Sequence, residues 1–203
     1  DGADSLSAAM AVNVVGTNSA TIADLFSTVS YSNNDGTENW SNSWQELGEN
    51  NGASTGFVEV DSRKDALEIG SGPVLLLFPS DITGLGAERT ADLSSALTAT
   101  LSFDARIAGV STGSSVTISV SDDGSTWTDL ANISFASLST SLSHYSFDIS
   151  NYTSATTSIR VTGDGFVGGV LLSGYFYVDN VSIDYTYNTP PDITSDGGGA
   201  PAD

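Results

Sequence analysis

Two tryptophans, Trp40 and Trp44, lie in a segment that is rich in asparagine, serine and glutamate. An indole ring can stack on the apolar face of a sugar ring, while nearby amide and carboxylate groups bond the sugar hydroxyls. Asn34 and Glu46 are the candidates for these polar partners. The segment therefore predicts a ligand-binding loop. A second interpretation stays open, in which the two indoles anchor the loop to the hydrophobic core.

A third tryptophan, Trp127, follows the tight-turn sequence Asp-Asp-Gly at positions 122–124. It alternates with Thr126 and Thr128, as side chains of a strand do, so we expect it to pack rather than to bind. The turn is similar to the Asp-box turn of sialidases, but its Asp-to-Gly spacing is one residue too short. It predicts a hairpin only.

The sequence offers little for catalysis. His144 is the only histidine, and no nucleophile elbow accompanies it, so a Ser-His-Asp triad is not expected. A glycosidase needs only two carboxylates at a set separation. Among 25 acidic residues some pairs will have that separation by chance, so the number of acidic residues does not exclude a glycosidase. In the absence of a recognisable motif, we predict that the chain is not an enzyme.

Charge excludes several classes of partner. The chain has 25 acidic and 5 basic residues, a formal net charge of -20. Nucleic acids and anionic membrane surfaces require clustered Lys and Arg, so neither is expected as a partner. The acidic surface fits two other roles, namely solubility in a salty medium and the binding of divalent cations.

Hydropathy and cysteine content narrow the class further. The longest apolar run, Val74 to Phe78, is far shorter than the roughly 20 residues of a membrane helix, so no membrane insertion is expected. The absence of cysteine excludes disulfides and thiolate metal sites, which leaves oxygen-ligated ions, calcium above all. Residues 1–7 lack the pattern of a signal peptide, so we expect any export signal to lie outside the sequence given.

The elements that must position these residues are strands. Clear alternation of apolar and polar residues marks five segments, around residues 101–105, 116–120, 145–149, 159–161 and 176–185. The first two, joined by a Gly/Ser/Thr turn, predict neighbouring strands of an antiparallel meander. The alternation changes phase near Asp179 and Asn180, which predicts a β-bulge there.

The first half of the chain is less regular. We predict an edge strand at 8–15, a long surface loop at 33–55, and short strands at 57–60, 66–69 and 74–78. The total of about nine to eleven strands predicts an all-β protein, an antiparallel jelly-roll β-sandwich. Residues 1–187 would form one domain, and the Pro/Gly-rich residues 188–203 a linker or tail.

Two stretches carry a resemblance to known domains. The first is residues 30–46, SYSNNDGTENWSNSWQE; the second runs from TLSFDAR at 100–106 through VSDDGSTWT at 120–128 and FDIS at 147–150 to FYVDNVSI at 176–183. Over residues 22–185 the chain resembles the galactose-binding-like and MAM-like sandwiches, a group with many carbohydrate-binding modules, as found in bacterial secreted and adhesin proteins. The tail resembles the entry to a cadherin-like repeat.

The resemblance implies a structural calcium ion where the first and last strands meet, with a late aspartate as ligand. Asp179 stands in the matching Tyr-Val-Asp-Asn-Val context. Its candidate partners are Asp24, Asp35 and Glu38, because calcium takes six to eight oxygen ligands.

The expected function is that of a non-catalytic, extracellular binding or adhesion module, secreted or held on a bacterial surface, with a glycan or other cell-surface ligand and calcium for rigidity. One alternative is a structural spacer of a large adhesin, or a filament subunit that binds copies of itself or neighbouring domains through strand addition by residues 8–15. Another is an accessory domain of a secreted hydrolase.

Overall fold

A computed structural model of the chain describes residues 16–62, 72–78, 80, 82–108, 114–135, 142–164 and 175–189. The predicted strands at 8–15 and 66–69 and the tail from 190 onward lie outside these residues. The described part contains the strands β1 (Gly16–Asp24), β2 (Gln45–Leu47), β3 (Val58–Asp61), β4 (Val74–Leu77), β5 (Gly86–Ala91), β6 (Ala96–Ala108), β7 (Ser115–Ser121), β8 (Thr128–Ser134), β9 (Ser143–Asp148), β10 (Thr157–Asp164) and β11 (Tyr175–Thr189), with one 3-10 turn, η2 (Ser150–Tyr152). In these ranges no helix is long and apolar enough to cross a membrane.

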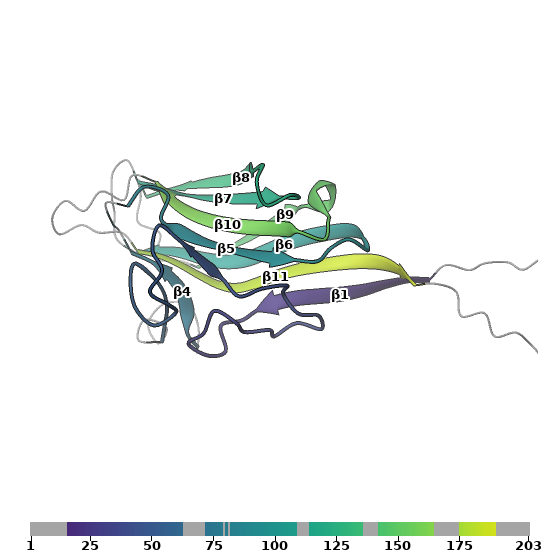
Figure 1. The fold of residues 1–203 in the computed structure, drawn as a ribbon, viewed down its shortest axis with the longest axis horizontal. Helices are drawn as coiled ribbons and strands as arrows, with labels where there is room; N and C mark the ends of the chain where they lie inside the picture. The colour runs from purple at the N-terminus through teal and green to yellow at the C-terminus, as the bar shows by residue number, and fades with distance from the viewer. Residues whose placement is uncertain are drawn as a thin grey trace, which may run out of the picture.

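The strands form two antiparallel sheets that pack face to face (Figure 1). The first sheet has the order β3-β4-β11-β6-β9, and the second has the order β2-β5-β10-β7-β8. β11 is the centre of the first sheet: β6 pairs along one side of it, while β4 and β1 pair with successive halves of the other side. The predicted all-β jelly-roll sandwich is confirmed, with eleven strands among the described residues.

The core lies between the sheets and follows the alternation of the sequence. Inward side chains of β6, β7 and β11 are buried, and most of their neighbours on β6 are half-buried. On β7 and β11 some neighbours are buried as well, namely Ser119, Ser121, Tyr177 and Asp179. Burial of these Val, Ile, Leu and Phe side chains is the main favourable contribution to folding, at roughly 25 cal/mol per Å² of apolar surface. The alternation in the second half of the chain therefore predicted the correct faces.

The predicted meander of β6 and β7 is wrong. β6 pairs with β11 and β9 in the first sheet, and β7 pairs with β10 and β8 in the second. The chain thus crosses from one sheet to the other between these strands. Period-2 alternation shows which side chains are buried but not which strand pairs with which, since both sheets present the same pattern to a shared core.

The predicted bulge is confirmed on β11. Register with β6 shifts between Asp179 and Ser182, and Asn180 within the shift has a φ of 52°. Asparagine tolerates this left-handed conformation better than most residues do. The bulge lets Val178 before it and Val181 after it both enter the core.

The first half of the chain departs most from expectation. β1 and β5, which were not predicted, are strands with weak alternation, and β2 lies inside the predicted surface loop. The loop runs back along β1, where the Asp35 and Glu38 amides donate to the Ala23 and Thr21 carbonyls at 2.9 and 3.0 Å. A Cβ on Gly36 would lie 2.3 Å from the Thr21 oxygen, so only glycine allows this approach.

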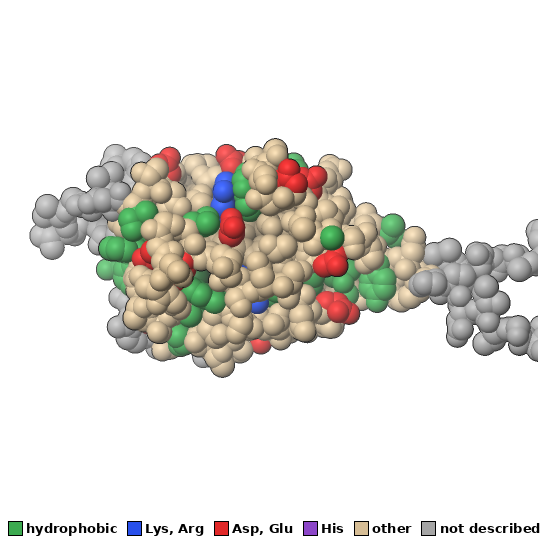
Figure 2. Space-filling view, viewed as in Figure 1, with side chains coloured by type: hydrophobic (Ala, Val, Ile, Leu, Met, Phe, Trp, Pro, Cys, Tyr) green, Lys and Arg blue, Asp and Glu red, His purple; other side chains and the backbone are tan. Residues whose placement is uncertain are grey.

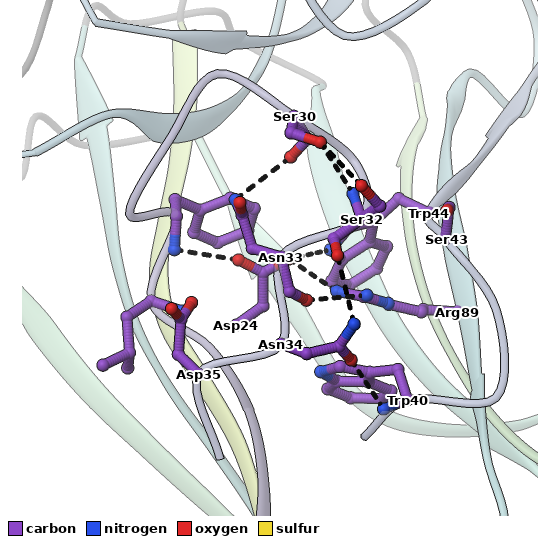
Figure 3. A network of polar contacts seen from close by, with 12 residues as sticks. Asp24, Ser30, Ser32, Asn33, Asn34, Asp35, Trp40, Ser43, Trp44 and Arg89 are labelled. Carbon is purple, nitrogen blue, oxygen red and sulfur yellow. Dashed lines mark hydrogen bonds and ion pairs between the residues drawn. The ribbon is translucent and has the colours of Figure 1, made fainter. Parts of the chain in front are cut away.

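A buried ion pair joins the two sheets behind this loop. Asp24, at the end of β1, and Arg89, on β5, have fully buried side chains, and their Oδ2 and Nη1 atoms are 2.6 Å apart (Figure 3). The remaining Arg89 nitrogens donate to the Asn33 and Asn42 carbonyls at 2.8 and 2.9 Å. One guanidinium therefore holds the first sheet, the second sheet and the loop together.

Burial opposes both charges of this pair. Burial raises the pKa of Asp24, whereas the Phe26 amide, the Arg89 charge and the Trp44 indole each lower it. Burial lowers the pKa of Arg89 to about 10, although the charge and hydrogen bond of Asp24 act to raise it. Because each charge depends on its partner, removal of one leaves an uncompensated charge in the core.

We expect Arg89→Leu and Asp24→Asn each to lower the free energy of unfolding by about 3–5 kcal/mol, the usual cost of breaking a buried ion pair. The double variant should lose less than the sum of the two, because it leaves no charge without a partner. Urea unfolding measures all three, with the exposed Asp164→Asn as the control for loss of one carboxylate. Additive losses would contradict the role given to the pair.

Candidate ligand-binding groove

The predicted stacking residues are in the core. Trp40 and Trp44 are only 6% and 2% exposed. Their rings lie 6.2 Å apart, and the Arg89 guanidinium sits 4.9 and 5.9 Å from their centroids. The prediction that they present a surface for a sugar is wrong, because the loop folds inward over the sandwich. The alternative, that they anchor the loop to the core, describes their position.

The predicted polar partners are used by the loop itself. The Asn34 side chain accepts from the Trp40 amide at 2.8 Å and donates to the Ser32 carbonyl at 3.1 Å. The Glu46 carboxylate accepts from the Tyr31 hydroxyl and from the amides of residues 51 and 52, at 2.7 to 3.0 Å. Asn34 and Glu46 therefore brace the turns of their own segment, and the structure does not bring them together with an exposed ring.

The predicted calcium ligands do not form one site. Both Asp24 oxygens are occupied, Oδ1 by the Phe26 amide and Oδ2 by the Trp44 indole and Arg89, so a guanidinium stands where a metal cation was expected. Asp35 accepts from the Leu25 amide at 2.9 Å. The backbone of Glu38 forms an isolated β-bridge with Ile22 on β1.

No group of three His, Cys, Asp or Glu side chains in the described ranges could hold a metal ion. The ligand set predicted from Asp179, Asp24, Asp35 and Glu38 therefore does not fit calcium. An ion held by other residues stays a prediction.

Asp179 is nevertheless an unusual carboxylate. It is 8% exposed, accepts from the Asn180 amide at 2.7 Å, and pairs in register with Asp104 on β6. Burial, together with the charges of Asp104 and Asp24, raises its pKa to about 6, although the hydrogen bond from the Asn180 amide acts in the opposite direction. Asp104 in turn bonds Asn180 and His144, so the only histidine belongs to a surface contact on β9 rather than to a triad.

Trp127 packs on a cation. The Arg160 guanidinium on β10 lies 3.9 Å from its ring centroid. The Asp123 side chain closes the preceding hairpin by accepting from the amides of Ser125 and Thr126 at 2.7 and 2.6 Å. The hairpin predicted there is confirmed.

A groove of about 350 Å³ lies where β1 and β11 of the first sheet meet the connection between β5 and β6. Figure 2 shows hydrophobic and acidic side chains side by side at this end of the molecule, where β1 begins and β11 ends. The groove is lined by Ile22, Glu38, Asn39, Asp92, Ser94, Ser95, Tyr185 and Tyr187. We call it the tyrosine groove.

Two rings form the aromatic part of the tyrosine groove. Tyr185 and Tyr187 alternate on β11, so they project from the same side of the strand, with ring centroids 5.9 Å apart and planes at 41°. Tyr185 is 8% exposed, whereas Tyr187 is half-buried and offers more of its face. The backbone holding them is rigid, since β11 pairs there with both β1 and β6.

The polar part of the groove has free hydrogen-bonding capacity. Among the described residues, the side chains of Glu38, Asn39 and Ser95 bond to no other protein group, whereas those of Asn34 and Glu46 are fully engaged. Asp92 is held in place by the Ser94 amide and hydroxyl at 3.0 and 2.7 Å. The groove thus presents one fixed acceptor, Asp92, and three unengaged polar side chains beside two rings.

Electrostatics tie these groups together. Burial raises the pKa of Tyr185, and the charges of Glu38 and Asp92 act in the same direction. The Ser94 hydrogen bonds lower the pKa of Asp92, so this carboxylate is ionised at neutral pH. The tyrosine groove is therefore a negatively charged aromatic site.

Sequence reasoning did not find this groove. Tyr185 was recognised only as part of the alternating strand, and Glu38 only as a candidate metal ligand. One feature of the sequence could have indicated the groove. Two tyrosines stand two positions apart near the end of the last strand, so both side chains lie on the same face of that strand. The lining residues come from four separate stretches of the chain, which no spacing rule connects.

Comparisons with known proteins agree with the fold. No protein-family model matches the chain, and no curated protein does. Among solved structures, the CBM22-1 xylan-binding domain of Paenibacillus barcinonensis Xyn10C is similar, with a TM-score of 0.50 and 9% identity over 86% of this chain and 97% of that one. At this identity the similarity concerns the sandwich fold alone.

Two further structures have lower scores. TmCBM61 in complex with β-1,4-galactotriose has a TM-score of 0.47 and 12% identity over 72% of this chain and 88% of that one. A family 29 carbohydrate-binding module has a TM-score of 0.46 and 12% identity over 87% of this chain and 91% of that one.

We expect Trp44→Ala to cost about 3–5 kcal/mol, the usual cost of removing a large buried aromatic side chain. In a chain of this size that corresponds to a melting temperature lower by roughly 10 °C. Trp127→Ala, which removes a half-buried ring, should have a smaller effect. Differential scanning calorimetry compares the two. An unchanged melting temperature in Trp44→Ala would restore the ligand-binding interpretation of the loop.

Asp179 should make stability depend on pH. Its folded-state pKa of about 6 lies above the ordinary aspartate value of 3.8, so the folded protein binds this proton more tightly than the unfolded chain does. The destabilisation is therefore complete above pH 6 and is relieved as the pH falls toward 4. Asp179→Asn removes the charge and keeps the acceptor for the Asn180 amide.

We accordingly expect Asp179→Asn to be more stable than the original protein at pH 8, with the difference disappearing near pH 4. Urea unfolding at a series of pH values measures this. The variant could instead be less stable at pH 8, or its free energy of unfolding could differ from that of the original protein by the same amount at every pH. Either result would show that the Asp179 charge is not destabilising.

Proposed function

We propose that this chain is a non-catalytic glycan-binding module whose ligand lies in the tyrosine groove. The observation that carries the proposal is the combination of two tyrosine rings with unengaged Glu38, Asn39 and Ser95 side chains in one concave site. A sugar has an apolar face for the rings and a periphery of hydroxyls for the polar groups.

The size and rigidity of the groove support this proposal. Its volume of about 350 Å³ falls within the range of roughly 300–1,000 Å³ typical of small-ligand sites. Tyr185 and Tyr187 stand on a strand paired on both sides, so little conformational entropy is lost when a ligand binds. The fold shared with a xylan-binding domain supports the same class of function by analogy only.

The setting of the module is part of the proposal. A soluble glycan-binding sandwich without cysteines and with a net charge of -20 suits an extracellular environment, where it serves as part of a secreted hydrolase or a surface adhesin. The spacer or filament role proposed for residues 8–15 concerns residues outside those the structure describes. The groove favours the binding role, because a pure spacer has no use for unengaged polar groups beside a half-buried ring such as that of Tyr187.

Tyr187→Ala should weaken binding to a recognised soluble glycan at least tenfold, equivalent to about 1.4 kcal/mol, because it removes the more exposed ring. Asn39→Ala should weaken binding too, with little change in melting temperature. Affinity electrophoresis against a panel containing xylan, galactan and glucomannan, followed by calorimetry on the best ligand, measures this.

Trp127→Ala is the matched control, since it removes an aromatic side chain on the other sheet, and it should bind normally. If Trp127→Ala loses binding while Tyr187→Ala retains it, the ligand lies on the outer face of the second sheet. If correctly folded protein binds no glycan in a broad panel, the proposed function is wrong.

A further inference from the structure

The tyrosine groove carries negative charge without a counterion of its own. Glu38 and Asp92 both line it, and no Lys or Arg among the described residues does. Of the basic residues that the structure describes, Arg89 is enclosed with Asp24 in the core, and Arg160 lies under Trp127 on β10. Arg106 is on β6 opposite Tyr177, ten positions along that strand from Ala96, the partner of Tyr187.

The two carboxylates differ in how they are held. Asp92 is fixed and kept ionised by two hydrogen bonds within its own turn, to the Ser94 amide and hydroxyl. Glu38 is anchored through its backbone, whose amide donates to the Thr21 carbonyl at 3.0 Å, while its carboxylate bonds to no group of the described chain. The groove therefore offers one fixed and one adjustable carboxylate.

The two tyrosine rings that line the groove with these carboxylates have the same preference for positive charge. The faces of Tyr185 and Tyr187 carry negative quadrupole charge and attract cations, an effect that is strongest where water is partly excluded. Glu38 and Asp92 line the groove with Tyr185, and their charges, after burial, contribute to the raised pKa of its hydroxyl. A ligand carrying a positive charge would be stabilised by both kinds of group.

We propose that the groove selects glycans with protonated amines, that is, polymers of unacetylated hexosamine, over neutral glycans and above all over uronic-acid polymers. This specificity rests on the proposed glycan-binding function. The sugar ring stacks on Tyr187, and the ammonium lies toward the Glu38 and Asp92 carboxylates. A uronate in the same position would bring a third carboxylate into a site that has no cation to pair with it.

The test compares three oligosaccharides of equal length by isothermal titration calorimetry: a glucosamine oligomer, its fully N-acetylated counterpart, and a galacturonate oligomer. At about pH 5.5 the amines are protonated, and carboxylates with ordinary pKa values near 4 are ionised. The glucosamine oligomer should bind at least tenfold more tightly than the acetylated one, and the galacturonate oligomer should not bind. The preference should shrink in about 0.5 M salt, which screens exposed charges.

Substitutions at Glu38 and Asp92 test whether these two groove residues determine the preference for a protonated amine. Glu38→Gln and Asp92→Asn should each reduce binding of the glucosamine oligomer several-fold and leave binding of the acetylated oligomer nearly unchanged. Asp148→Asn is the matched control: like Asp92, Asp148 is exposed and accepts from the amide and hydroxyl of a serine two residues later, but it lies on β9, outside the groove. It should bind all three oligomers as the original protein does.

Each result has a separate meaning. Equal affinity for the glucosamine and acetylated oligomers would overturn this specificity and leave the proposed function standing. An equal loss of binding in Asp148→Asn would show that overall charge, not the groove, attracts the amine, and would overturn the assignment to Glu38 and Asp92. If none of the three oligomers binds and neutral glycans also fail, it is the proposed function that is wrong.

Discussion

The buried pair of Asp24 and Arg89 is the constraint on which the rest of the structure depends. Arg89 reaches Asp24 on the opposite sheet, two backbone carbonyls of the covering loop, and the faces of Trp40 and Trp44. A guanidinium is suited to this position because its planar fork can serve several acceptors at once and its faces can stack on aromatic rings. Because it must be neutralised and fully bonded, it dictates where the loop lies.

The ion pair also explains the distribution of function. The residues with the strongest sequence signal for binding hold the loop over Arg89, so the Trp44 indole N–H, the Asn34 amide and the faces of both tryptophans are already in use. Asp24, one of the expected calcium ligands, is paired with the Arg89 guanidinium instead. Binding capacity remains where the loop leaves the core, at Glu38 and Asn39, opposite the tyrosines at the end of β11.

The second half of the fold was largely predictable, because each strand there has one face in water and one in the core. The strands containing Leu101, Ile118 and Ile159, and the bulge after Asp179, followed from that alternation. β5 was missed because its inward residues include Arg89 flanked by alanines, and a charged residue facing the core inverts the expected pattern. Pairing of β6 and β7 was misread because alternation carries no information on the partner strand.

The sequence by itself determined the class: an acidic all-β sandwich without thiol chemistry or clustered cations, because composition and period-2 alternation are local properties that each segment carries alone. The tertiary structure decided which aromatic residues are buried and which can meet a ligand. Trp40 and Trp44 resemble Tyr185 and Tyr187 in being paired aromatics near carboxylates, and only the path of the chain separates them. The groove joins segments more than a hundred residues apart, so its negative charge and its open rings exist only once the two sheets have closed on Arg89.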